Sequence, residues 1–150
     1  MDVMIHVDLV GFEQLAEECG SLAPEIRLTD HARQRLRGRR NTNFVLREGT
    51  ERAGFLVGYE EPDSYFYVYL FGVAPTLRRR GIGSHLMKYT EEWAAGRGRG
   101  GIRIQSRNKY PAMLQLLISR GYKIVRFEDR GDLDASPIRF EKAFPAGDSP

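Results

Sequence analysis

The chain has 150 residues, of which 41% are hydrophobic and 29% charged, and this composition suits a globular protein with its own core. Its formal net charge is +3, no apolar stretch is long enough to span a membrane or act as a signal segment, and one cysteine excludes an internal disulfide. The histidines and Cys19 lie far apart in the sequence, so no metal site is expected. We therefore predict one domain, residues 1–150 with a loose tail over 145–150, located in the cytoplasm.

Hydrophobic periodicity and turn residues predict eleven elements along the chain. The predicted strands are 1–8, 43–47, 53–59, 65–73, 102–106, 122–127 and 138–144. The predicted helices are 12–19, 30–37, 81–95 and one that begins near Pro111 and stops at Gly121. Hairpins up to the strand at 65–73, followed by crossovers through helices, predict an α/β (α+β) fold. Its central sheet is mixed and mostly antiparallel, with about seven strands flanked by about four helices.

The segment between the strand at 65–73 and the helix at 81–95 predicts an anion site. It reads Arg78-Arg79-Arg80-Gly81-Ile82-Gly83-Ser84. At the start of a helix, the first backbone N–H groups have no intrahelical partner and carry the positive end of the helix dipole. Gly81 and Gly83 leave room for a phosphate to reach these donors, and the three arginines add positive charge.

This segment, with Val73-x-Pro75 before it, resembles the pyrophosphate loop of the GCN5-related N-acetyltransferase (GNAT) family, which holds acetyl-coenzyme A (acetyl-CoA). A second segment is similar to the family as well, with Asn108 after a strand, Ala112 in the next helix, and Gly121-Tyr122 before the following strand. The resemblance covers about residues 68–127 and implies a GNAT-like sheet with acetyl-CoA as cosubstrate. It implies cofactor-binding roles for Phe71, Gly72, Val73, Arg78, Arg79, Arg80, Gly81, Ile82, Gly83, Ser84 and Asn108.

The resemblance leaves the general acid open. Many relatives protonate the departing thiolate with a tyrosine, but Leu117 or Gln115 stands at that place here, depending on the end from which one counts. Neither side chain is an acid at neutral pH. Tyr110, close to Asn108, is the best substitute, although a surface aromatic beside a helix is an equally good interpretation.

The general base is open in the same way: many relatives carry a carboxylate on the strand before the loop or on the strand after the main helix, and here neither the strand at 65–73 nor the strand at 102–106 has one. We select Glu60, which belongs to an acidic turn with Glu61 and Asp63, and a solvated turn is the alternative. The backbone N–H of Val73 is expected to bind the thioester oxygen. Tyrosines 65, 67 and 69 share one face of their strand, where they serve either sheet packing or an acceptor pocket.

These features predict an enzyme that moves an acetyl group from acetyl-CoA directly to a primary amine. No covalent intermediate is expected, because Cys19 lies outside any motif. The missing acid and base motivate a first alternative, a non-catalytic acyl-CoA-binding sensor. Clusters of arginines motivate a weaker one, a basic nucleic-acid-binding domain. The acceptor stays open, no membrane partner is expected, and a homodimer is compatible with the sequence.

Overall fold

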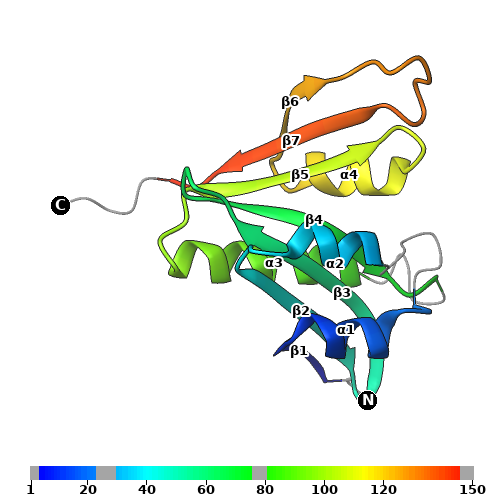
Figure 1. Ribbon diagram of the computed structural model, residues 1–150, viewed down its shortest axis with the longest axis vertical. Helices are drawn as coiled ribbons and strands as arrows, with labels where there is room; N and C mark the ends of the chain where they lie inside the picture. The colour runs from blue at the N-terminus through cyan, green and yellow to red at the C-terminus, as the bar shows by residue number, and fades with distance from the viewer. Residues whose placement is uncertain (1–3, 23–29, 76–80, 146–150) are drawn as a thin grey trace. The chain divides into compact units, whose positions relative to one another are not determined.

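The computed structural model describes residues 4–22, 30–75 and 81–145 (Figure 1). The chain divides into two compact units, which we describe in turn. The first consists of Met1–Glu60 with Val68–Thr90, and the second of Glu61–Tyr67 with Glu91–Pro150. One strand, β4 (Tyr65–Val73), and one helix, α3 (Ile82–Gly96), contribute residues to both units.

The remaining elements follow the predicted order. Those of the first unit are β1 (Ile5–Val10), α1 (Phe12–Cys19), α2 (Asp30–Leu36), β2 (Asn41–Glu48) and β3 (Glu51–Glu60). Those of the second unit are β5 (Gly101–Arg107), α4 (Pro111–Ser119), β6 (Lys123–Phe127) and β7 (Pro137–Ala143). Within the described residues, seven strands and four helices therefore confirm the predicted element order.

The strands form one seven-stranded sheet in the order β1-β2-β3-β4-β5-β7-β6. Neighbours β1 and β2 pair antiparallel, as do β2 and β3, with Asn43 opposite Val57. In the second unit β7 pairs antiparallel with both β5 and β6. The predicted fold class, a GNAT-like sheet flanked by helices, is confirmed.

The hairpin between β2 and β3 is tighter than its polar sequence suggests. Glu48 and Glu51 were expected in the turn, but they pair with each other as the last and first strand residues. The turn is Gly49-Thr50, and Gly49 has a φ of 65°, in the left-handed region that such two-residue turns require. Strand pairing satisfies the backbone N–H and C=O groups of a residue whatever its side chain is. The polar side chains of Glu48 and Glu51 therefore made the predicted strands too short at the hairpin.

Helices cover both faces of the first unit's strands (Figure 1). On one face, Phe44 of β2 packs edge-on against Tyr89 of α3, with ring centroids 5.1 Å apart. On the other face lie α1 and α2, whose apolar side chains Leu15 and Leu36 are buried. Helices on both faces explain why consecutive residues are buried along most of β2 and β3, including the apolar runs 44–46 and 55–57.

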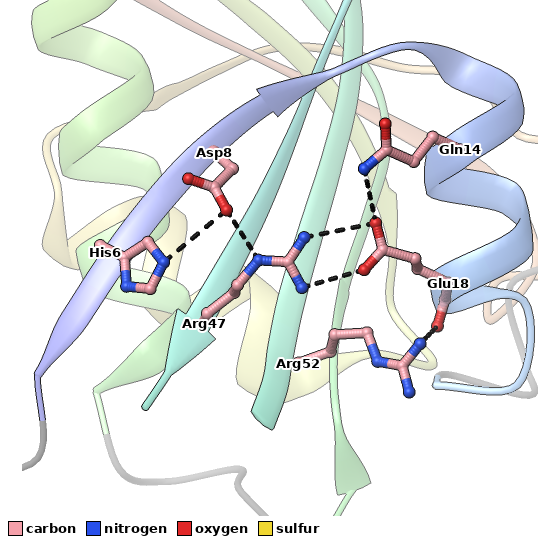
Figure 2. Close-up of polar contacts among 6 residues, drawn as sticks. All are labelled: His6, Asp8, Gln14, Glu18, Arg47 and Arg52. Atoms are coloured by element: carbon pink, nitrogen blue, oxygen red, sulfur yellow. Dashed lines mark hydrogen bonds and ion pairs between the residues drawn. The ribbon is translucent and has the colours of Figure 1, made fainter. Parts of the chain in front are cut away.

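A polar cluster joins α1 to the first two strands (Figure 2). The guanidinium of Arg47 on β2 donates to Asp8 Oδ2 at 2.7 Å and to both carboxylate oxygens of Glu18 at 2.9 and 3.3 Å. His6 Nε2 lies 3.7 Å from the same Asp8 oxygen, and Gln14 donates to Glu18 at 2.9 Å. The hydrogen bonds from Arg47 hold the pKa of Glu18 below its ordinary value.

In the second unit a buried carboxylate has the corresponding role. Glu91 of α3 accepts hydrogen bonds from the Arg120 guanidinium at 2.6 and 3.1 Å, from the Tyr122 hydroxyl at 2.9 Å and from Lys142 Nζ at 3.1 Å. Burial alone raises the pKa of Glu91, but these donors outweigh it and hold the pKa below its ordinary value. In the second segment that resembles the family, Gly121-Tyr122 has a packing role. The Tyr122 ring is buried, and its hydroxyl donates a hydrogen bond to Glu91 on α3.

We predict that Arg47→Gln lowers the free energy of unfolding by about 2 kcal/mol, because Asp8 and Glu18 lose their shared donor. Arg52→Gln is the matched control, since Arg52 is exposed and, among the described residues, donates its hydrogen bond to the Glu18 backbone carbonyl and not to a carboxylate. The native pKa of Glu18 lies below its unfolded value, so this stabilisation exists above pH 4.5 and is lost as the pH falls through the native pKa. Thermal unfolding of both variants between pH 3 and 7 checks this (about 2–4 °C per kcal/mol), and equal effects of the two substitutions would contradict it.

Candidate active site

The end of β4 and the start of α3 form the core of the candidate site. Just beyond β4, the Ala74 N–H donates to the Ala53 carbonyl at 2.9 Å, which fixes the end of the strand against β3. Gly81 has a φ of 77°, and its carbonyl accepts the N–H of His85 at 3.0 Å. This i→i−4 bond belongs to the first turn of the helix, and the backbone N–H groups of Ile82 and Gly83 lie ahead of it in the chain. The helix has 15 residues, and its positive end coincides with the predicted phosphate site.

Gly54 on β3 allows the first turn of α3 to lie close to the sheet. A Cβ atom at this position would stand 3.1 Å from the Gly72 carbonyl oxygen, 3.4 Å from Ile82 Cγ2 and 3.6 Å from Leu86 Cδ2. The sequence analysis missed this residue, although a glycine inside an apolar strand is a known sign of close backbone approach.

The predicted cofactor residues divide into three groups. Phe71 and Val73 are half-buried on one face of β4, while Gly72 between them is buried. Ile82 is buried under the first turn of α3, and Gly83 and Ser84 are half-buried on it. Arg78, Arg79 and Arg80 lie outside the described residues, so their contribution stays a prediction.

Asn108 belongs to the second unit, where it lies in the turn after β5. It is exposed, and its side-chain amide donates to the Leu133 carbonyl at 3.1 Å. Together with a hydrogen bond from the Lys109 N–H to the Asp134 carbonyl, this contact fastens the 128–136 loop to the end of β5. Its cofactor-binding role stays a prediction beside this structural one.

The candidate acid is also in the second unit. Tyr110 is half-buried immediately before α4, and the Lys109 ammonium lies 5.2 Å from its ring centroid. Of the two positions where relatives would carry a tyrosine, Leu117 is fully buried and Gln115 is exposed.

The acidic turn after β3 is organised by Arg103. Its guanidinium lies 3.1 Å from Glu61, 2.7 Å from Asp63 and 3.0 Å from Glu141. Hydrogen bonding to Arg103 holds the pKa of Asp63 below its ordinary value. Glu61 and Asp63 are paired with this cation, and Glu60, half-buried at the end of β3, stays the candidate base that the sequence predicted.

A group of arginines and tyrosines lies on the face of β3 and β4 that α2 covers. Arg35 of α2 donates to the Tyr59 hydroxyl at 3.3 Å, and its guanidinium carbon lies 5.2 Å from the Tyr69 ring centroid. Arg39 lies over the Tyr59 ring at 4.5 Å. We call these four residues the Arg–Tyr cluster. Strand alternation indicated Tyr69, whereas no sequence pattern indicated that two arginines would reach the same rings.

The comparisons with known proteins agree with this geometry. The model of the "Acetyltransferase (GNAT) family" matches residues 9–117, which include β4 and the start of α3. The chain belongs to the GNAT family. A search of the curated proteins finds no match. Among the described residues, no helix is both long and apolar enough to cross a membrane.

Solved structures show the same GNAT fold at low sequence identity. An IAA acetyltransferase from Bacillus cereus has a TM-score of 0.80 at 18% identity, covering 94% of this chain and 100% of the other. The ribosomal-protein-S18-alanine N-acetyltransferase from Escherichia coli has a TM-score of 0.79 at 18% identity, and the match covers 97% of this chain and 99% of the other. A Bacillus subtilis acetyltransferase solved in complex with CoA has a TM-score of 0.75 at 18% identity, covering 95% and 99%.

We predict that Gly54→Ala weakens acetyl-CoA binding by about 3- to 10-fold, because the new methyl group would stand 3.1 Å from the Gly72 carbonyl oxygen and force the end of β4 to shift beside the site. Gly11→Ala is the matched control, since a Cβ at Gly11 meets nothing within 4 Å. Calorimetric titration measures affinity, and circular dichroism confirms that each variant is folded. Unchanged affinity in a folded Gly54→Ala protein would contradict the role assigned to this contact.

Proposed function

We propose that this GNAT-family chain is an N-acetyltransferase that uses acetyl-CoA and transfers the acetyl group to a primary amine. The observation that supports this best is the turn at Gly81, where a positive φ leads directly into the first turn of a 15-residue helix. Backbone N–H groups at such a turn can bind a pyrophosphate when no large side chain stands in front of them. Gly81, Ile82, Gly83 and Ser84 would supply these groups, with Arg78, Arg79 and Arg80 adding charge.

The pantetheine arm would then run along the end of β4, past Phe71, Gly72 and Val73. We assign the backbone N–H of Val73 to the thioester oxygen, where it would stabilise the negative charge that develops during attack. The amine nitrogen forms a bond to the thioester carbonyl carbon, and the carbon–sulfur bond breaks. The thiolate of CoA leaves with the electron pair, and the amine loses one proton. Tyr110 and Glu60 are our candidates for protonating the thiolate and accepting the amine proton.

The proposed transfer is direct, and the burial of Cys19 supports this. The side chain is only 1% exposed, and burial raises the pKa of its thiol to about 11. A nucleophilic cysteine requires an accessible thiolate at neutral pH. Holding the amine and thioester in line contributes on the order of 7–11 kcal/mol in well-oriented systems, which exceeds what proton transfer supplies.

A second candidate function is an acyl-CoA-binding sensor without catalysis. It is favoured by one observation: of the two positions where relatives would carry the acidic tyrosine, Leu117 is fully buried in the core. Such a protein would bind acetyl-CoA and release no thiol with any amine. The two functions therefore differ in turnover and not in cofactor binding.

We predict that Gly83→Glu weakens acetyl-CoA binding by about 100-fold or more, since a carboxylate would occupy the first turn of α3 and repel the pyrophosphate. Gly96→Glu is the matched control, because it adds the same charge at the other end of the helix, where a Cβ meets nothing within 4 Å. Calorimetric titration of both variants, followed by thiol release with an amine panel, checks the site and the activity. Equal weakening by both variants would contradict the pyrophosphate site, and binding without thiol release would favour the sensor.

We predict that Cys19→Ala keeps acetyl transfer within about twofold of the wild-type rate, because direct transfer needs no enzyme nucleophile. In the native protein Cys19 should also resist thiol reagents at pH 8, and it should react once the protein is unfolded. Mass spectrometry after incubation with acetyl-CoA should find no acetyl group on Cys19. Loss of turnover in a folded Cys19→Ala protein, or an acetylated Cys19, would contradict direct transfer.

A further inference from the structure

The Arg–Tyr cluster combines two cations with two aromatic rings on one face of the first unit's sheet. Its members come from three elements and the segment after α2: Arg35 from α2, Arg39 just beyond it, Tyr59 from β3 and Tyr69 from β4. The two tyrosine rings are neighbours, with centroids 6.5 Å apart and planes inclined by 50°. Arg35 contacts both rings and Arg39 contacts one, so the four side chains form a single group.

The charge of Arg39 is used differently from that of Arg33 on α2. Arg33 is paired with Glu13 at 2.9 Å and with Asp30 at 2.9 Å. Within the described residues, the guanidinium of Arg39 contacts the Tyr59 ring and no carboxylate, and its residue is exposed. A contact with a ring face uses none of the guanidinium N–H donors for a carboxylate, and a guanidinium can donate the two parallel hydrogen bonds that carboxylates and phosphates accept.

The position of the cluster relates it to the proposed chemistry. Tyr69 precedes Phe71 and Val73 on β4 and points to the same face of the strand. At about 3.3 Å per residue, Tyr69 lies roughly 7–13 Å along the strand from these two positions. An acceptor whose amine reached the thioester beside Val73 would therefore extend its body over Tyr69 toward Arg35 and Arg39.

We propose that the acceptor amine carries an oxyanion, a carboxylate or a phosphate ester, and that Arg39 and Arg35 bind it above the rings of Tyr59 and Tyr69. This inference rests on the proposed acetyl transfer and names the chemical class of its acceptor. The hydroxyl of Tyr69 adds a neutral donor, since burial raises the pKa of this phenol. The cluster discriminates by charge and distance, because an acceptor without an anionic group would leave the Arg39 guanidinium without the anion that we propose it binds.

Matched acceptors test this proposal. One pair is a C-terminally amidated peptide with an N-terminal alanine and either glutamate or glutamine at its third position, and the other is an aminoalkyl phosphate beside the alkylamine of equal length. In the wild type, kcat/KM read from thiol release should favour the anionic member of at least one pair by about tenfold or more. The pair that responds identifies the anion as a carboxylate or a phosphate.

Substitutions then test whether Arg39 causes the preference for the anionic acceptor. Arg39→Gln should abolish it by lowering kcat/KM for the anionic acceptor while leaving the neutral acceptor within about twofold. Arg40→Gln is the matched control, because it removes the same charge from the adjacent exposed residue, and it should preserve the preference. Equal loss in both variants would overturn the proposal in favour of diffuse charge attraction.

Binding measured without turnover separates this proposal from the proposed function. Each acceptor is titrated calorimetrically into the CoA-loaded protein. Transfer to amines without any anion preference would overturn the anionic acceptor and leave the acetyltransferase intact. Anion binding that is lost in Arg39→Gln, with no thiol release from any amine, would support the anion site and overturn acetyl transfer. If the anionic acceptors neither bind nor react, the anion site is overturned.

Discussion

The candidate site depends on how closely the first turn of α3 can approach the end of β4. Gly54 removes a side chain at the point where the Gly72 carbonyl, Ile82 and Leu86 meet, and Gly81 supplies the left-handed backbone that turns the chain into the helix. A side chain at position 54 would crowd the Gly72 carbonyl, and a side chain at position 81 would strain the turn that leads into α3. The helix dipole and the N-terminal N–H donors of α3 are therefore placed by packing in the first unit.

Each unit also uses a multiply bonded ionic group to hold its helices. Arg47 joins two carboxylates in the first unit, while Arg103 joins three carboxylates and Glu91 joins three donors in the second. These groups are partly or largely removed from water, so each requires its partners and fixes the register of its elements. Arg39 differs, since an aromatic ring supports it without consuming its hydrogen-bonding capacity toward an anion.

Most of the fold could be predicted from the sequence, because periodicity and turn residues are local signals. The strand Tyr65–Val73 was predicted with its observed bounds, and the order of all the other elements was predicted correctly. The site was only partly predictable, since Gly81 and Gly83 lie in a recognisable pattern whereas Gly54 acts through residues far away in sequence. The same is true of Arg35 and Arg39, whose tyrosine partners lie on other elements, and of Arg103, whose pairing withdrew Glu61 and Asp63 as candidate bases.

The measurement that tests the central claim most directly is NMR of the individual backbone amides with and without acetyl-CoA. It records both the chemical shift of each amide and the rate at which its hydrogen exchanges with solvent. If the start of α3 binds the pyrophosphate, the amides of Ile82, Gly83 and Ser84 should shift and exchange more slowly. These changes should saturate at the acetyl-CoA concentration at which calorimetry finds saturation. Saturable binding that leaves these three amides unchanged would contradict the account, because the cofactor would then be held by another part of the protein.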